Sequence, residues 1–157
     1  MSNAVRLIIS LALPLAVGFT ASQFTTPEID GWYRTIEKPS WQPPSAVFGP
    51  VWTALYILMG IALFLVWKKE APHAQKRTAI TLFGVQLVFN FLWSFLFFRM
   101  HRIDLALVEI IILLLLIVLT TIAFSRISKQ ASWLMVPYIA WVSFATALTY
   151  TIWRLNA

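Results

Sequence analysis

The sequence contains no cysteine and carries few charged residues for its length. Without cysteine, disulfide bonds, thiolate nucleophiles and cysteine-ligated metals are excluded. Charged residues make up 11% of the 157 residues, whereas soluble domains average about 25%. Since 60% of the residues are hydrophobic and the mean hydropathy is +0.79, the chain cannot present a surface that water solvates well. We therefore predict an integral membrane protein surrounded by membrane lipid.

Five apolar runs are each long enough to cross about 30 Å of hydrocarbon, which takes about 20 helical residues. They cover residues 7–26, 46–67, 78–98, 104–125 and 131–153. Backbone groups in lipid must be satisfied internally, so each run is predicted to be helical. The fold class is thus an all-α membrane protein, with residues 1–157 forming one bundle of five transmembrane helices. The first run also has features of a signal peptide, but its length favours a retained helix.

The net charge of +6 comes from twelve lysines and arginines that lie between or at the ends of the apolar runs. Basic residues in these positions flank membrane helices, which argues against nucleic acid as a partner. With five spans, seven of the twelve cations fall on the side of the N-terminus and five on the opposite side. This difference favours an N-terminus on the inner side of the membrane.

The segment between the first two spans, residues 27–45, is rich in proline and aromatic residues. Pro39, Pro43 and Pro44 fix φ and remove hydrogen-bond donors, so they predict a stiff, extended path. The aromatic side chains on this path need an apolar surface to rest on. We predict that this lid loop covers a cavity among the helices. The alternative is a loop that lies on the lipid headgroups.

Tryptophans divide into two groups along the chain. Three lie at span ends, where an aromatic belt at the membrane interface explains them. The other five run from the lid loop toward the middle of the membrane: Trp32, Trp41, Trp52, Trp93 and Trp141. A belt does not explain this second group, so it indicates an aromatic lining that starts at the loop.

Polar residues in the third span share one helix face. Gln86, Asn90 and Ser94 recur every four residues. Amides that face lipid are costly, so this face is predicted to point into the bundle. Two interpretations remain open, namely hydrogen bonds between helices or one wall of a ligand pocket. The neighbouring Trp93 favours the pocket for Asn90, whereas Gln86 suits both equally.

Two further stripes point to the same kind of lining. Trp52 and Tyr56 share a stripe on the second span, and Trp141, Ala145 and Thr149 share one on the fifth. Indole and phenol rings stack on flat aromatic molecules, while amides and loop groups can meet a polar rim. The pattern therefore predicts a flat, mostly apolar ligand.

Ionisable residues offer few sites inside the spans. His73 and His101 lie in loops on opposite sides of the membrane, so neither can ligate haem iron from within the bundle. A metal-free tetrapyrrole, or haem held without a histidine, fits better, and no metal site is predicted. Glu109 is the one acid inside a span and is a functional candidate by default. It supports an alternative function, a proton-coupled exporter of small molecules.

Several motifs, taken in chain order, resemble the TspO family of tryptophan-rich sensory proteins and translocator proteins. They are WY at 32–33, EKPSWQPP at 37–44, GPVWTALYILMG at 49–60, QLVFNFLWSFLFF at 86–98, VPYIAWVSFATAL at 136–148 and YTIWRLN at 150–156. The resemblance implies a five-helix membrane protein, commonly a homodimer, that binds porphyrins in a pocket capped by its first loop. A bacterial cell membrane is the expected location.

The resemblance also implies a set of site residues and a ligand. By matching motif positions, the pocket is expected to comprise Tyr33, Trp52, Asn90, Trp141 and Ala145, with Trp41 and Trp93 beside them. The expected ligand is a porphyrin, protoporphyrin IX or haem, with no resident cofactor, and the expected role is that of a receptor, sensor or carrier. Light- and oxygen-dependent porphyrin breakdown is the enzymatic alternative, and it would use Trp52 and Trp141.

The resemblance extends to a sterol motif near the C-terminus, formed by Leu148, Tyr150 and Arg154. Motifs of this kind are weak patterns on their own. The family usually has asparagine between this leucine and tyrosine, where the present chain has Thr149. The loss of an amide lowers the expected affinity for cholesterol-like sterols. Benzodiazepine-site ligands are a further expectation from the family.

Overall fold

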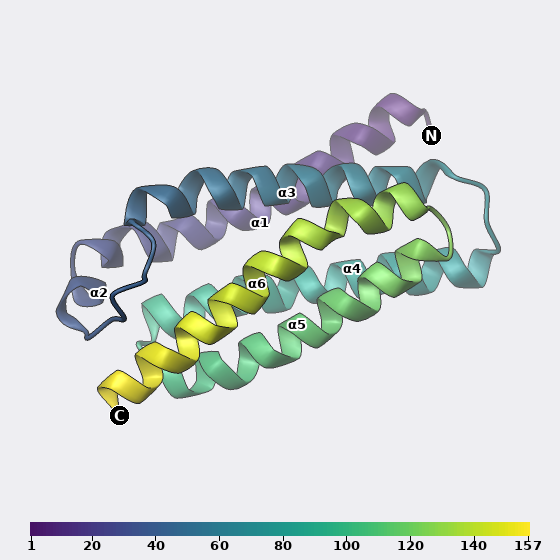
Figure 1. Ribbon diagram of the computed structural model, residues 1–157. Helices are drawn as coiled ribbons and strands as arrows, with labels where there is room; N and C mark the ends of the chain where they lie inside the picture. The colour runs from purple at the N-terminus through teal and green to yellow at the C-terminus, as the bar shows by residue number, and fades with distance from the viewer.

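The computed structural model describes residues 1–157, all of which lie in helices or short connections. Five long helices make up the molecule (Figure 1): α1 (Asn3–Ile29), α3 (Ser45–Lys68), α4 (His73–Ser94), α5 (Ile103–Ser125) and α6 (Lys129–Asn156). Two short elements complete it, namely α2 (Trp32–Thr35) and the π-helical turn η1 (Phe95–Arg99), which continues α4. The five long helices are each long and apolar enough to cross a membrane, which confirms the predicted all-α, five-helix class.

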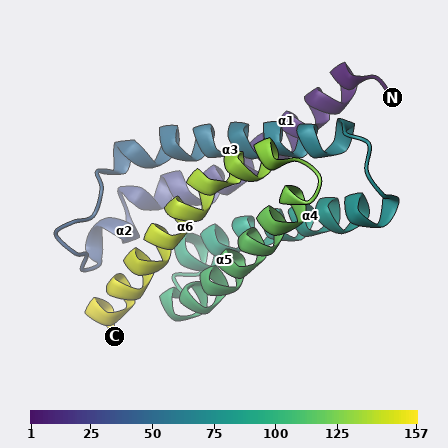
Figure 2. The same ribbon diagram turned by 45° about the vertical axis from the view of Figure 1, so that its right-hand side comes forward.

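The long helices lie side by side, and their contacts close a ring in the order α1, α3, α6, α5, α4. Both ribbon views show α6 running between α3 and α5 (Figures 1 and 2). The N-terminus, the α3–α4 connection and the α5–α6 connection lie at one end of the bundle, called here the N-terminal end. The helix α2, the η1–α5 turn and the C-terminus lie at the other, the lid end.

Local sequence explains where these helices begin. The Ser2 Oγ accepts a hydrogen bond from the backbone N–H of Val5 (3.3 Å), and the Ser128 Oγ accepts one from Ala131 (3.2 Å). Such caps satisfy N–H groups that lack a partner within the helix. The helices α3 and α4 begin immediately after a proline, whose own missing N–H leaves no donor unsatisfied there.

Two glycines bring α1 and α3 into close contact. A Cβ atom on Gly60 of α3 would lie 2.7 Å from the carbonyl oxygen of Ser10 in α1. A Cβ atom on Gly18 of α1 would clash with the ring of Tyr56 in α3. The two helices can therefore approach only because both positions lack a side chain, and Gly18 helps to set the position of the Tyr56 ring.

The connection between α1 and α3 differs from the predicted lid loop of residues 27–45. The helix α1 continues through Pro27 to Ile29, and Trp32–Thr35 forms α2. Asp30 and Gly31 form a turn between these two helices, and residues 36–44, called here the strap, are extended or turn-like. The long loop is thus not confirmed, because membrane helices tolerate a proline that would end a helix in most soluble proteins.

Candidate functional site

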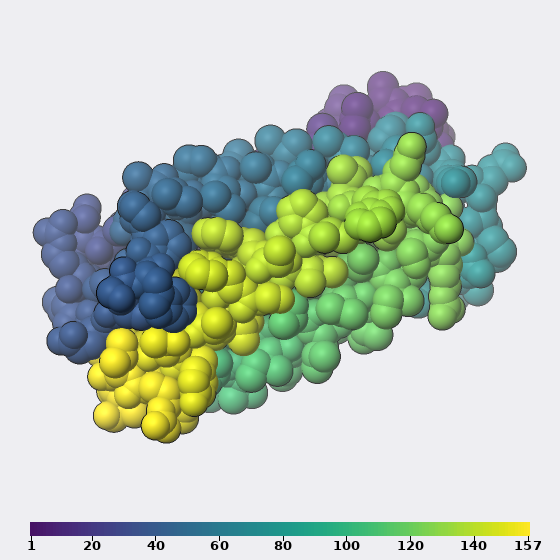
Figure 3. Space-filling view, in the orientation of Figure 1, coloured from purple at the N-terminus to yellow at the C-terminus, as the bar shows by residue number.

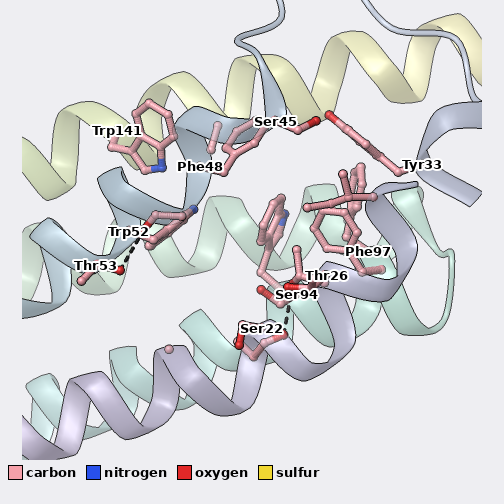
Figure 4. Close-up of a pocket in the computed structure, with 18 of the residues that line it drawn as sticks. Ser22, Thr26, Tyr33, Ser45, Phe48, Trp52, Thr53, Ser94, Phe97 and Trp141 are labelled. Carbon is pink, nitrogen blue, oxygen red and sulfur yellow. Dashed lines mark hydrogen bonds between the residues drawn. The ribbon is translucent and has the colours of Figure 1, made fainter. Parts of the chain in front are cut away.

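A cavity of about 500 Å³ lies in the half of the bundle nearest the lid end. It is enclosed by α1, α3, α4 with η1, and α6, and α2 contributes Tyr33 (Figure 4). None of its 25 lining residues is charged. Small-molecule sites typically have volumes of about 300–1,000 Å³ and a mostly apolar lining, so the cavity has the size and character of a ligand site.

Three helices each place one tryptophan on this cavity, namely Trp52 from α3, Trp93 from α4 and Trp141 from α6. Figure 4 shows Trp52 and Trp141 at one side of the cavity, with Tyr33 and Phe97 at the other. Trp93 stacks on Phe97, with ring centroids 5.3 Å apart. Of the predicted site residues, the cavity brings together Tyr33, Trp52, Tyr56, Trp93, Trp141, Ala145 and Leu148.

Other predicted residues lie outside the lining. Trp41 is 48% exposed and packs edge-on against Phe144, 5.8 Å away between ring centroids. It therefore covers a lining residue from outside, where the strap lies against α6 (Figure 3). In the predicted sterol motif only Leu148 faces the cavity, because Tyr150 and Arg154 are exposed on the outer surface of α6.

Asn90 also lies outside the lining, behind the Tyr56 ring. The Tyr56 hydroxyl donates to Asn90 Oδ1 (2.7 Å), and Asn90 Nδ2 donates to the Tyr138 hydroxyl (2.8 Å). The Tyr138 hydroxyl in turn donates to Gln86 Oε1 (2.7 Å). This buried network joins α3, α4 and α6, so the structure gives Asn90 and Gln86 the interhelical role rather than the pocket wall.

Sequence reasoning missed Tyr138, although a signal was present. A phenol in the middle of an apolar span needs a hydrogen-bond partner, and the Gln86 and Asn90 amides supply one each. It also missed the contribution of α1, where Ser22 and Thr25 line the cavity. These two hydroxyls recur at helical spacing on the first span, which marks an inward face.

The polar groups of the cavity divide into donors and acceptors. The hydroxyls of Ser22, Thr53 and Thr149 donate to carbonyl oxygens of their own helices, so toward the cavity they offer only oxygen lone pairs. The indole N–H groups of Trp93 and Trp141 are buried and have no partner within the protein. Because both nitrogen atoms are buried, a ligand acceptor could reach them only after the indole rings move.

Hydrogen bonds fix the strap over the lid end. The side-chain amide of Asn156, in the last turn of α6, accepts from the backbone N–H of Glu37 (3.0 Å) and donates to its carbonyl (2.8 Å). Lys38 Nζ donates to the carbonyls of Tyr33 (2.7 Å) and Ile36 (2.9 Å). Burial raises the pKa of Tyr33 to about 12, so this lining residue is a neutral phenol at physiological pH.

A second contact holds α2 in place. The ring of His101 stacks on Trp32, with centroids 4.1 Å apart and 7° between the planes. His101 Nε2 lies 3.3 Å from a carboxylate oxygen of Glu28 near the end of α1. Both histidines, His73 and His101, lie outside the cavity lining, so neither reaches a ligand held there.

Glu109 of α5 is buried, at 5% exposed, and neither of its carboxylate oxygens has a hydrogen-bond partner. It does not line the cavity, so its position lends no support to proton-coupled export through that space. A buried carboxylate without a partner is costly to ionise. Burial of the Glu109 carboxyl group therefore lowers the stability of the fold.

Glu109→Gln is expected to raise the thermal unfolding midpoint of the detergent-solubilised protein at neutral pH by a few degrees. The substitution keeps the shape of the side chain and removes the free-energy cost of burying an ionisable group, which must take up a proton to avoid an unpaired charge, for a gain of about 1 kcal/mol. The measurement is circular dichroism during heating. A lower midpoint for the variant would mean that the carboxylate stabilises the fold through a contact.

Comparison with known proteins supports the family indicated by the motifs. The model of the TspO/MBR family matches residues 10–154. The "Tryptophan-rich protein TspO" of Chlorobaculum tepidum is 47% identical over 96% of this chain and 95% of its own length. The human "Translocator protein" is 38% identical over 88% of this chain and 82% of its own. The "Tryptophan-rich sensory protein" of Cereibacter sphaeroides is 38% identical over 81% and 78%.

These matches run through all five long helices and through the residues that line the cavity. The five apolar helices, read together with the matches, make this an integral, multi-pass membrane protein. The chain belongs to the TspO/MBR family.

Proposed function

We propose that this protein is a membrane receptor or sensor that binds a tetrapyrrole of the porphyrin type, protoporphyrin IX or haem, in the cavity. The observation that carries the proposal is the convergence of Trp52, Trp93 and Trp141, from three helices, on one uncharged space. Stacking on indole faces favours flat aromatic ligands. The cavity volume of about 500 Å³ lies in the range typical of small-molecule sites and suits a porphyrin macrocycle.

The polarity of the lining indicates how such a ligand would lie. No cation lines the cavity, so the apolar macrocycle would be inside and the propionate groups would stay at the mouth. Lys38 in the strap is the cation nearest to the lining residue Tyr33, 4.9 Å from its ring centroid. Two of its three N–H groups are used by carbonyls, which leaves one for a propionate oxygen.

The names of the relatives agree with this proposal at a coarser level. "Translocator protein" and "Tryptophan-rich sensory protein" fit a protein that recognises a small molecule in the membrane. A second candidate function is light- and oxygen-dependent breakdown of the bound porphyrin. It is favoured by the two indoles, Trp52 and Trp141, that share the cavity where no acid–base residue is present.

Titration of the purified protein with protoporphyrin IX, followed by the shift of the porphyrin absorption band, is expected to saturate. Trp52→Ala and Trp141→Ala should each weaken porphyrin binding by about tenfold. Each substitution removes a stacking interaction that contributes about 1.4 kcal/mol to the binding free energy. The matched control is Trp133→Ala, since Trp133 is 71% exposed and lies at the opposite end of the bundle. It should bind porphyrin like the unmodified protein.

Binding that does not saturate, or that all three variants leave unchanged, would exclude a porphyrin site in the cavity. Illumination of the same complexes distinguishes the two candidate functions. A new absorbing product that requires oxygen and both indoles supports the enzyme, whereas bleaching at the rate of free porphyrin supports a receptor that only binds.

A further inference from the structure

Charge is distributed unequally between the two ends of the bundle. The N-terminal end carries seven cations and a single acid, Glu70, which is an excess of six. The lid end carries five cations and four acids, which is an excess of one. The seven cations at the N-terminal end are Arg6, Lys68, Lys69, Lys76, Arg77, Arg126 and Lys129.

Ion pairs occur only at the lid end. They are Arg34–Asp30 (3.3 Å) and Arg102–Asp104 (2.8 Å). The carboxylate of Glu28 at this end also lies 3.3 Å from His101. At the N-terminal end Arg6 and Lys76 donate to neutral oxygens of Asn3 and Trp67. The remaining five are exposed and form no ion pair, and they are called here the basic ring: Lys68, Lys69, Arg77, Arg126 and Lys129.

Part of the basic ring is unfavourable for the fold by itself. Arg77 lies near the start of α4 and Lys129 is the first residue of α6. The N-terminus of a helix carries partial positive charge, so cations there are repelled by the helix dipole. Neither helix has an acid in its first turn to offset this.

Aromatic residues place the basic ring at the depth of the lipid headgroups. Trp133 is 71% exposed one turn after Lys129, and Trp67 directly precedes Lys68. Tryptophans at the ends of apolar spans lie at the membrane–water interface.

We infer that the N-terminal end of the bundle binds anionic phospholipids, with the phosphate groups on the basic ring. Polybasic surfaces at headgroup depth attract anionic lipid by about 1 kcal/mol for each cation, which is about fivefold in affinity. The occupant is a lipid rather than a soluble polyanion because Trp67 and Trp133 place these charges at the depth of the lipid headgroups. This surface is separate from the cavity and does not depend on its ligand.

The test uses the full chain in nanodiscs of phosphatidylcholine, with and without phosphatidylglycerol. The thermal unfolding midpoint is expected to be several degrees higher with phosphatidylglycerol, and the difference should shrink at high salt. Native mass spectrometry should detect phosphatidylglycerol retained on the protein. Replacing all five residues of the basic ring by glutamine should abolish both effects.

A pair of matched variants keeps the test decisive if the fivefold variant does not fold. Arg77→Gln with Lys129→Gln removes two charges from the basic ring, and Arg99→Gln with Arg154→Gln removes two exposed charges from the lid end. Only the first pair should weaken the retention of phosphatidylglycerol. Equal midpoints in the two lipid mixtures, or an equal loss in both pairs, would overturn the inference. Porphyrin titration is independent of either outcome.

Discussion

Replacing Asn90 by leucine is expected to lower the free energy of unfolding by about 2–5 kcal/mol. Leucine can neither accept from the Tyr56 hydroxyl nor donate to that of Tyr138. The Tyr56 hydroxyl then loses its acceptor, and Tyr138 keeps only its bond to Gln86. A buried polar group without a partner costs about 1–3 kcal/mol. Denaturant unfolding in mixed micelles, followed by circular dichroism, measures the change.

Two controls separate the network from a simple loss of side-chain atoms. Thr149→Val removes a buried hydroxyl whose only bond goes back to the Ala145 carbonyl, and it should change stability by less than about 1 kcal/mol. Adding Tyr56→Phe to Asn90→Leu should regain part of the loss, because the hydroxyl that lost its acceptor is then removed, while Tyr138 keeps its bond to Gln86. A double variant that is less stable than Asn90→Leu would contradict this explanation.

Gly60→Ala is expected to destabilise the bundle by about 1–3 kcal/mol. The added methyl group would lie 2.7 Å from the Ser10 carbonyl oxygen and 3.1 Å from Cα of Leu11, both backbone atoms of α1. Neither can move aside as a side chain does, so α1 must shift away from α3. The same unfolding assay should show a lower midpoint, and porphyrin binding should weaken because both helices line the cavity.

Gly84→Ala in α4 is the matched control for this substitution. A Cβ atom there meets nothing within 4 Å, and alanine favours a helix over glycine by about 0.5–1 kcal/mol. The control should therefore be as stable as the unmodified protein or slightly more so. If both glycine variants lost the same stability, the close contact between α1 and α3 would not be the reason.

The transmembrane helices were predictable because length and apolarity alone decide them. The expected spans 46–67 and 104–125 agree to within one residue at each end with α3 and α5. A lipid environment permits no other backbone structure for such runs. The boundary between the first helix and the following loop was harder to predict, because Pro27 lies inside α1 rather than after it.

The aromatic part of the site was predictable for a different reason. Trp52 and Trp141 stand at depths that an interfacial belt does not explain, and both line the cavity. The role of Asn90 was harder to predict. Helical periodicity indicates the direction in which a side chain points, but it does not indicate which group the side chain contacts. In the structure the Tyr56 hydroxyl donates a hydrogen bond to Asn90 Oδ1 (2.7 Å), and this contact depends on how α3 and α4 pack together.

The side chain of Asn156 connects the strap to α6. It forms hydrogen bonds with both the backbone N–H and the carbonyl of Glu37. The same helix contributes Trp141, Phe144 and Leu148 to the cavity lining. A displacement of the last turns of α6 must therefore carry the strap with it. If a ligand in the cavity displaces the end of α6, the strap on the surface is expected to move with it.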